Sequence, residues 1–308
     1  MKKTSLCIHG GAGVITRGSL SPELEKEYRR GLEDAMTCGL KILSSGGNAI
    51  DAVEAAVVSL EDNPLFNAGK GSVLTHEGVC EMDAALMDGS TGKAGSVAGV
   101  TTIKNPVRLA RLVMERSAHV MLAGKGAEEF ARTNGAEEMP ADYFLTELRK
   151  QQWEKMKNSD SVSLDHDGNK KFGTVGAVAL DTNGNLAAAT STGGMTNKRW
   201  GRIGDSPVIG AGTFADHVVA ISCTGHGEFF IRHVVAHEIS ALMRMRNMTL
   251  ADAAGLLVDT VLKNAGGEGG LIAVDHDGNI ALPFNTPGMY RAWTDASGNI
   301  RTGVYRES

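Results

Sequence analysis

The pattern of apolar and polar positions divides the chain into two halves, and the first half is mainly helical. A strand is predicted where apolar residues follow Thr4, and it ends at a run of glycines. Ser21 followed by Pro22 is typical of a helix start, with serine as the N-cap and proline at the first helical position. The pattern predicts strands at 4–9, 79–86 and 94–103, helices at 22–44, 48–60 and 106–116, and two further helical segments between 124 and 157.

A polar segment separates this half from a strand-rich second half. Residues 157–171 carry few apolar side chains and show no helical period, which predicts a loop or linker. Beyond it the pattern predicts strands at 174–180, 186–191, 208–213 and 218–223, helices at 229–246 and from 249 to about 266, and hairpins at 271–285 and 290–304. This order fits antiparallel sheets covered by helices on both sides better than a βαβ repeat.

A short repeat, Asp-x-x-Gly-Asn, marks the predicted hairpin turns. Three copies lie between apolar runs, and a fourth lies in the polar linker; the copies occupy 165–169, 181–185, 275–279 and 295–299. A calcium loop is not indicated, because the first ligand and the closing Glu of an EF-hand are missing. The turn at 181–185 joins two predicted strands, so it should place Thr192 beside Thr174.

Composition and charge exclude several classes of protein. The 308 residues carry a net charge of −5 without a basic stripe, which argues against nucleic acid as a partner. No apolar run approaches the length of a membrane helix, and the apolar run at the start is too short for a signal peptide. The cysteines are scattered, which favours reduced thiols in a cytoplasmic protein over a disulfide framework or a zinc site; they are Cys7, Cys38, Cys80 and Cys223.

The junction between Gly173 and Thr174 has the arrangement that a self-cleaving hydrolase needs. Thr174 is the first residue of a predicted core strand and directly follows the polar linker. A cut before Thr174 would free its α-amine, which has a pKa near 8 and can act as the base for the threonine hydroxyl. A strand that simply begins with threonine, a common β residue, explains the same ten residues.

Two other motifs have simpler explanations than catalysis. His9-Gly10-Gly11 resembles the oxyanion glycines of esterases, but the Gly-x-Ser-x-Gly elbow of that fold is absent from the sequence. His233 and His237 share one face of a predicted helix, as in zinc proteases, yet the general-base Glu does not lie between them. A glycine turn and surface histidines are therefore the better interpretations.

Three polar clusters after Thr174 lie at predicted strand ends. The first is Ser191-Thr192-Gly193-Gly194. The second, residues 201–206, places Arg202 and Asp205 three residues apart on a glycine-rich loop, where they could hold the carboxylate and ammonium of an amino acid. The third, residues 223–228, offers a hydroxyl and flexible backbone N–H groups suited to an oxyanion hole.

These clusters closely resemble the motifs of plant-type (type III) L-asparaginases, also called isoaspartyl aminopeptidases. The resemblance covers nearly the whole chain except the linker. It rests on Gly173-Thr174-Val175-Gly176-Ala177-Val178-Ala179, Ser191-Thr192-Gly193-Gly194, Gly201-Arg202-x-Gly204-Asp205-Ser206-Pro207, Thr224-Gly225-x-Gly227-Glu228, His9-Gly10-Gly11-Ala12-Gly13, Gly47-x-Ala49-x-Asp51-Ala52-Val53, Leu60-Glu61-Asp62-Asn63-Pro64-x-Phe66-Asn67-Ala68-Gly69-x-Gly71-Ser72 and Glu81-Met82-Asp83-Ala84.

The resemblance implies an N-terminal-nucleophile (Ntn) hydrolase of α+β class, a four-layer αββα sandwich of antiparallel sheets covered by helices. It implies a precursor that cuts itself between Gly173 and Thr174. The products would be an α subunit, residues 1–173 with a flexible linker at about 157–172, and a β subunit, residues 174–308. The two subunits would form one intertwined domain and assemble as an (αβ)₂ heterotetramer.

The resemblance also assigns roles by position. Thr174 would be the nucleophile, with Thr192 and Asn67 around its hydroxyl, and Thr224 with the Gly225 N–H would form the oxyanion hole. Arg202 would bind the substrate α-carboxylate. Asp205 and the Gly227 carbonyl would bind the α-amine, within a substrate-binding set that comprises Arg202, Ile203, Gly204, Asp205, Thr224, Gly225, His226 and Gly227. Catalysis would need no cofactor, but a structural sodium ion would be held by backbone carbonyls of Leu60, Glu61, Asn63, Phe66, Ala68 and Lys70.

The implied substrates are small molecules, namely L-asparagine and β-aspartyl (isoaspartyl) dipeptides. Relatives often carry a smaller residue at the position of His226, which leaves the substrate range open. Three alternatives stand beside this function. They are a lysosomal aspartylglucosaminidase, disfavoured by the missing cysteine framework and signal peptide, a Taspase-like protease, and a binding module that holds amino acids without cleaving.

Overall fold

The structure is a computed structural model that describes residues 4–158 and 173–306. The first part of the chain forms β1 (Ser5–Gly13), α1 (Pro22–Ser44), α2 (Ala49–Glu61), β2 (Met82–Asp88), β3 (Ala94–Val100), α3 (Pro106–Arg116), β4 (Met121–Ala123), α4 (Gly124–Thr133), α5 (Ala141–Phe144) and α6 (Glu147–Asn158). Helix α1 starts as predicted, because the Ser21 side chain accepts a hydrogen bond from Leu24 N and Pro22 opens the first turn. Helix α6 extends to Asn158, so the first two residues of the predicted linker are helical; the rest of it, residues 159–172, lies outside the described residues.

The second part supplies more strands and the remaining helices. Its elements are β5 (Thr174–Leu180), β6 (Leu186–Thr192), β7 (Thr213–Ala215), β8 (Val219–Gly225), α7 (Gly227–His233), α8 (Val235–Arg246), α9 (Leu250–Gly255), the π-helical segment η1 (Leu256–Leu262), α10 (Lys263–Ala265), β9 (Gly269–Asp275), β10 (Ile280–Ala281), β11 (Gly288–Thr294) and β12 (Ile300–Tyr305).

Within the described residues the strands form two sheets. The larger has the order β12-β11-β1-β5-β6-β2-β3-β4, and the smaller has the order β10-β9-β8-β7. All pairs are antiparallel except β3 with β4, which is parallel. Strand β1 lies between β5 and β11, so residues before and after the linker share one sheet.

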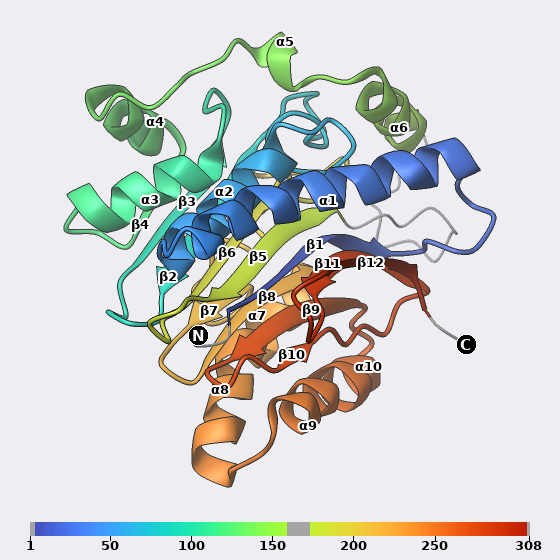
Figure 1. Cartoon of the computed structure of the whole chain (residues 1–308). Helices are drawn as coiled ribbons and strands as arrows, with labels where there is room; N and C mark the ends of the chain where they lie inside the picture. The colour runs from blue at the N-terminus through green and yellow to red at the C-terminus, as the bar shows by residue number, and fades with distance from the viewer. Residues whose placement is uncertain (1–3, 159–172, 307–308) are drawn as a thin grey trace.

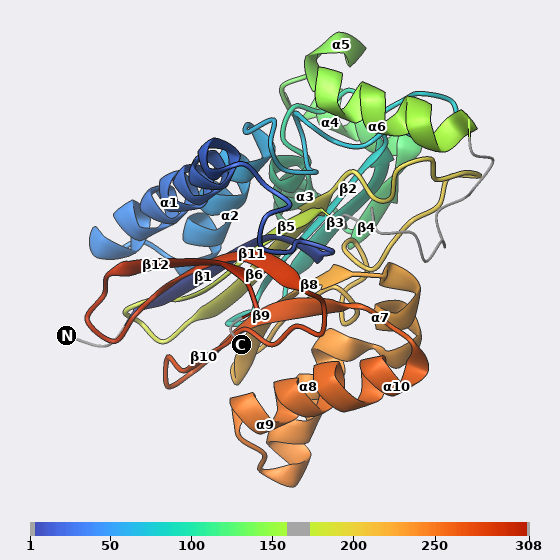
Figure 2. The ribbon, with the colours of Figure 1, turned by 90° about the vertical axis from the view of Figure 1, so that its right-hand side faces the viewer.

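The layers are helices, large sheet, small sheet and helices, as the αββα expectation requires. Figure 1 and Figure 2 show α1, α2 and α3 over one face of the large sheet, and α8 and α9 on the far side of the small sheet. One apolar core joins the first helices to the large sheet, a second fills the space between the sheets, and a third joins the small sheet to α7–α9 and η1. Burial of these three apolar layers supplies the main driving force for the fold.

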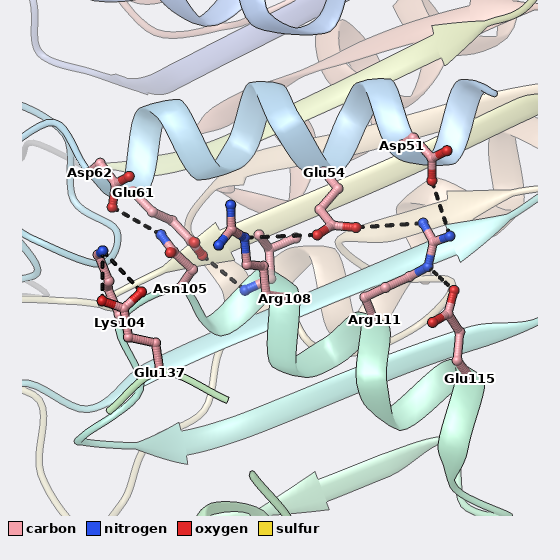
Figure 3. Close-up of polar contacts among 11 residues, drawn as sticks. Asp51, Glu54, Glu61, Asp62, Lys104, Asn105, Arg108, Arg111, Glu115 and Glu137 are labelled. Atoms are coloured by element: carbon pink, nitrogen blue, oxygen red, sulfur yellow. Dashed lines mark hydrogen bonds and ion pairs between the residues drawn. The ribbon is translucent and has the colours of Figure 1, made fainter. Parts of the chain in front are cut away.

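Polar contacts reinforce the packing of α2 against α3 (Figure 3). Arg111 of α3 forms ion pairs with Asp51 and Glu54 of α2. Glu61, at the end of α2, is fully buried, and its Oε1 accepts hydrogen bonds from Ser191 Oγ (2.6 Å) and from the backbone N–H at the start of α3 (3.0 Å). The Glu61 carboxyl therefore connects α2 with the start of α3 and with Ser191 of β6.

Several predicted bounds shift by a few residues, three helices stand where two were predicted between 124 and 157, and two predicted elements differ in kind. The predicted helix at 229–246 is broken at Val234, which has φ 48°, because Ala236 N and His237 N donate to the carbonyls of Ala211 and Gly210 instead of to the preceding helical turn. The predicted strand at 208–213 is a series of turns, and only its last residue, Thr213, enters a strand, β7.

None of the helices in the described part of the chain is long and apolar enough to cross a membrane.

Candidate active site

Thr174 and Thr192 face each other at the open end of a hairpin. The turn at 181–185 sets the register in which Leu180 pairs with Leu186 and Thr174 pairs with Thr192, as the sequence predicted. Thr174 Oγ1 donates to Thr192 Oγ1 at 3.1 Å, and Thr192 Oγ1 donates to the Gly173 carbonyl at 3.3 Å. The two hydroxyls thus connect the Thr174 side chain with the carbonyl of the peptide bond that precedes it.

Asn67 supports this pair through the turn that follows Thr192. Its Nδ2 donates to Gly194 O at 2.8 Å, and its Oδ1 accepts from Val73 N at 2.8 Å. Gly194 N in turn donates to Thr192 Oγ1 at 2.9 Å. The Asn67 amide therefore binds the turn beside Thr192, and its side chain also packs against Gly173, where a Cβ would lie 2.5 Å from the Asn67 Cβ.

Thr224 and Gly225, the two residues expected to form the oxyanion hole, are the last residues of β8. Thr224 is fully buried, and its Oγ1 accepts from Ala12 N at 3.3 Å, which leaves the hydroxyl hydrogen as a donor. Gly225 has φ 149°, and a Cβ there would lie 2.4 Å from the Glu268 carbonyl, so only glycine fits.

The Arg202 guanidinium is held from one side by Glu228. Nε and one terminal nitrogen, Nη2, donate to the two Glu228 carboxylate oxygens at 3.0 and 2.9 Å, a bidentate pair. A Cβ at Gly204 would lie 2.9 Å from Nη1, and one at Gly227 would lie 3.0 Å from Nη2. The glycines therefore leave room for the guanidinium head.

Asp205 is buried beside this arginine, and its carboxyl retains binding capacity. Its Oδ2 has no hydrogen-bond partner among the described residues. Burial raises the pKa of Asp205 to about 7, and the nearby Arg202 charge opposes that rise. The carboxyl lies between Gly212 and Gly227, where a Cβ would come within 2.8 Å of Oδ2 and Oδ1 respectively. A cation that reached Oδ2 would find an acceptor without a competing donor.

His226 and Ile203 lie at the rim. The His226 imidazole contacts the Glu228 carboxylate at 3.3 Å and the Phe229 ring edge-on at 4.8 Å, so it faces α7. Ile203 is partly exposed between Arg202 and Gly204. The structure gathers most of the predicted residues around one small pocket, lined by Gly173, Thr174, Thr192, Gly194, Met195, Arg202, Gly204, Asp205, Ser206 and Gly225.

Sequence reasoning assigned no role to His9, which lies in this region. Its imidazole Nδ1 lies 2.9 Å from the Thr174 carbonyl oxygen. The histidine was interpreted as part of a glycine turn and counted among the family motifs without a role, and nothing in the local sequence indicates that β1 runs beside β5. The other histidines that drew attention, His233 and His237, are separated by the break at Val234, and the His237 ring packs edge-on against Phe214 at 5.2 Å.

The loop predicted to hold sodium turns sharply at two glycines. Gly69 and Gly71 adopt φ 51° and 109°, and Lys70 N donates to Glu61 O at 2.7 Å, which closes the loop on itself. A carbonyl oxygen that accepts one hydrogen bond keeps a second lone pair, and backbone carbonyls of this loop are the ligands that the resemblance implies for sodium. No group of three or more His, Cys, Asp or Glu side chains in the described part of the chain is arranged for a metal ion.

Comparison with known proteins identifies the family of the chain. Residues 2–304 match the family model described as Asparaginase. The chain is 52% identical to an isoaspartyl peptidase of Salmonella typhimurium over 313 residues, which cover 100% of both proteins. It is also 52% identical to an isoaspartyl peptidase of Escherichia coli, over 100% of this chain and 98% of the relative.

A human protein named isoaspartyl peptidase/L-asparaginase is 42% identical over 299 residues, which cover 96% of this chain and 94% of the human one. The match of the family model spans both halves of the chain and every residue of the pocket. The chain therefore belongs to the asparaginase family of N-terminal-nucleophile hydrolases.

Proposed function

We propose that the chain cuts itself between Gly173 and Thr174 and then hydrolyses β-aspartyl dipeptides and L-asparagine. The observation that carries this proposal is the bond between the Thr174 and Thr192 hydroxyls, 3.1 Å long, at the edge of a pocket that also contains Arg202 and Asp205. The names of the relatives, isoaspartyl peptidase and isoaspartyl peptidase/L-asparaginase, support the substrate class.

Self-cleavage would use the same hydroxyl as catalysis. Thr174 Oγ attacks the Gly173 carbonyl carbon, its proton passes to the Thr174 nitrogen as the peptide C–N bond breaks, and an ester joins Gly173 to the threonine side chain. Water then hydrolyses the ester, which releases the Gly173 carboxylate and leaves Thr174 with a free hydroxyl and a free α-amine. The Thr192 hydroxyl supports the first step, because it donates to the Gly173 carbonyl oxygen at 3.3 Å and can stabilise the developing negative charge.

After the cut, the α-amine can take the proton of the Thr174 hydroxyl. Oγ then attacks the side-chain amide carbon of asparagine, or the β-linked peptide carbon of an isoaspartyl dipeptide. Thr224 and Gly225 would donate to the oxyanion. Ammonia or the released amino acid departs with a proton, and water hydrolyses the β-aspartyl ester to give aspartate and the free enzyme.

Recognition would rest on the two charges of a free amino-acid head. Arg202 keeps its Nη1 edge available while Glu228 occupies Nε and Nη2, so a substrate α-carboxylate can bind the remaining donors. The unpartnered Oδ2 of Asp205 suits the substrate α-ammonium. An internal peptide bond lacks both charges, which disfavours the protein-cleaving alternative.

The remaining features of the proposal concern the assembled enzyme. The cut would give an α subunit of residues 1–173 and a β subunit of residues 174–308, paired as (αβ)₂. A sodium ion would be bound by carbonyls of the loop from Leu60 to Lys70. The four free cysteines support a reducing compartment, and we propose the cytoplasm.

The test is the intact mass of denatured wild type, Thr174→Ala and Thr174→Ser proteins. We expect wild type to give two pieces that meet at Gly173 and Thr174. The serine variant keeps a hydroxyl and should also be cut, whereas the alanine variant should remain one chain of 32.4 kDa. The cut wild type should release ammonia from L-asparagine but not from L-glutamine, and leucine from β-aspartyl-leucine but not from α-aspartyl-leucine. A wild type that stays whole and only binds aspartate would favour the non-cleaving binding module.

A further inference from the structure

A line of polar side chains crosses the otherwise apolar layer between the two sheets. The layer is formed mainly by aliphatic residues of β1, β5, β6, β8 and β9. Within it, His9, Ser222, Thr190 and Thr213 are all fully buried. Buried polar groups are costly unless they are hydrogen-bonded, so their contacts with one another call for an explanation.

The contacts of His9 determine which of its ring nitrogens carries the proton. Nδ1 lies 2.9 Å from the Thr174 carbonyl oxygen, and Nε2 lies 2.9 Å from Ser222 Oγ. A carbonyl can only accept, so Nδ1 must donate. Burial lowers the pKa of His9 to about 3, which keeps the ring neutral at physiological pH. Nε2 is therefore an acceptor, and Ser222 must donate to it.

This assignment fixes the direction of the next bonds. Ser222 Oγ has given its hydrogen to His9, so it accepts from Thr190 Oγ1 at 2.7 Å. Thr190 Oγ1 in turn accepts from Thr213 Oγ1 at 2.6 Å. Each donor in the series therefore points toward the Thr174 carbonyl, and the series links β7 and β8 of the small sheet to β1, β5 and β6 of the large one.

The local backbone explains why a side chain binds the Thr174 carbonyl. The last pair of the β1–β5 ladder is His9 with Gly176, and the register of β1 against β11 shifts between His9 and Gly11. Thr174 lies two residues beyond this last pair. The imidazole therefore binds the Thr174 carbonyl where the ladder of β1 has ended.

Gly176 leaves the space through which the imidazole reaches Ser222. A Cβ at Gly176 would lie 2.0 Å from Ser222 Oγ and 2.5 Å from His9 Nε2, closer than atoms can approach. Neither neighbour can move freely, because both are fully buried between the sheets. The second glycine of Gly173-Thr174-Val175-Gly176 is thus required by the His9–Ser222 contact.

We propose that His9 is a positioning residue for the nucleophile, held in its donating tautomer by Ser222 and Thr190. By binding the Thr174 carbonyl, His9 fixes the rotation of Thr174 about its main-chain bonds, and this rotation directs Oγ toward Thr192. The inference rests on the proposed function, because it takes Thr174 as the nucleophile. The proposed role of His9 is to orient Thr174. Loss of the His9 hydrogen bond should therefore slow the chemical step, while substrate binding by Arg202 and Asp205 persists.

The experiment compares His9→Leu, His9→Asn and Ser222→Ala with a matched control, Ser5→Ala. Ser5 is buried on the same strand, and its Oγ donates to Gly278 O at 3.1 Å, so its loss removes a comparable bond of β1 away from the site. A small displacement of a reacting group costs about 100-fold in rate, so we expect His9→Leu to lower kcat and the rate of self-cleavage by that order, with KM nearly unchanged.

His9→Asn keeps an N–H donor near the position of Nδ1 and should recover part of the rate. Ser222→Ala should lie between wild type and His9→Leu, and Ser5→Ala should match wild type in kcat. ¹⁵N NMR spectra of the uncut Thr174→Ala chain report the tautomer of His9 without any measurement of activity. They should show the His9 ring protonated at Nδ1.

Either of two results would overturn the inference alone. One is an active wild type in which His9→Leu affects kcat no more than Ser5→Ala does, and the other is a His9 ring protonated at Nε2. A wild type that neither cuts itself nor hydrolyses any substrate would instead remove the proposed function, and this inference with it.

Discussion

Glu61 should make the stability of this protein depend on pH in a direction opposite to that of most carboxylates. It is fully buried at the end of α2, and its Oε2 has no hydrogen-bond partner among the described residues (Figure 3). Burial raises its pKa from 4.5 to about 8, and hydrogen bonds from Ser191 and Val107 only partly oppose the rise. The folded chain therefore keeps a proton on Glu61 at pH values where the unfolded chain has lost it.

The magnitude follows from this difference in proton binding. Folding takes up a proton between about pH 4.5 and 8, so the free energy of unfolding falls as the pH rises through this window and levels off above it. One pKa unit corresponds to about 1.4 kcal/mol, which gives a total loss of about 5 kcal/mol at most. Glu61→Gln removes the ionisable group but keeps an oxygen that can accept from Ser191 and Val107.

The assay is urea unfolding of both proteins at pH 5.5, 7 and 8.5, in the Thr174→Ala background so that each remains one chain. Between pH 5.5 and 8.5 we expect the stability of the parent to fall by about 3 kcal/mol relative to that of Glu61→Gln, because about 2.5 of the 3.5 pKa units lie above pH 5.5. Glu33→Gln changes a carboxyl on the exposed face of α1 and serves as the control, with no such divergence. Parallel pH profiles of Glu61→Gln and its parent would refute the reasoning.

Three further predictions concern the site and the backbone. Glu228→Gln should raise KM for asparagine by about tenfold with kcat little changed, because one charged partner of a bidentate Arg202 pair is lost; steady-state kinetics would show an unchanged KM if Glu228 were irrelevant. Calorimetric binding of L-aspartate should weaken as the pH falls through about 7, because Asp205 must be ionised to accept the ammonium, and Asp205→Asn should abolish this dependence. Val234→Gly should raise stability by about 1 kcal/mol, since Val234 has φ 48°, and an unchanged Tm would argue against backbone strain there.

Local patterns were sufficient to place Thr192 opposite Thr174. The Asp181–Asn185 turn and the alternation around it predicted that Thr192 lies opposite Thr174, and the register confirms this pairing. A tight turn fixes the pairing of the strands that it joins, so no distant part of the chain is needed for this inference. The N-cap at Ser21 was predicted on equally local grounds and is confirmed.

Contacts between distant segments decided what the pattern could not reveal. The break at Val234 interrupts a continuous helical pattern, because the carbonyls of Gly210 and Ala211 take the N–H groups that would continue the helix. His9 reaches Ser222 across 213 residues of sequence, and the contact exists only because two sheets pack face to face. A contact between two sheets does not change the pattern of apolar and polar residues along either strand, so the sequence does not predict it.

The central position of β1 has a consequence for how the protein is made on the ribosome. This strand is synthesised before the other described strands, yet its neighbours in the sheet are β5 and β11, which begin at Thr174 and Gly288. At translation rates of about 5–20 residues per second, the nascent β1 spends on the order of 10–30 s with both edges open before β5 emerges. During that interval its apolar side chains and free backbone groups are available to other chains. Yield in a foreign host should therefore depend on chaperones and growth temperature more than on the stability of the finished fold.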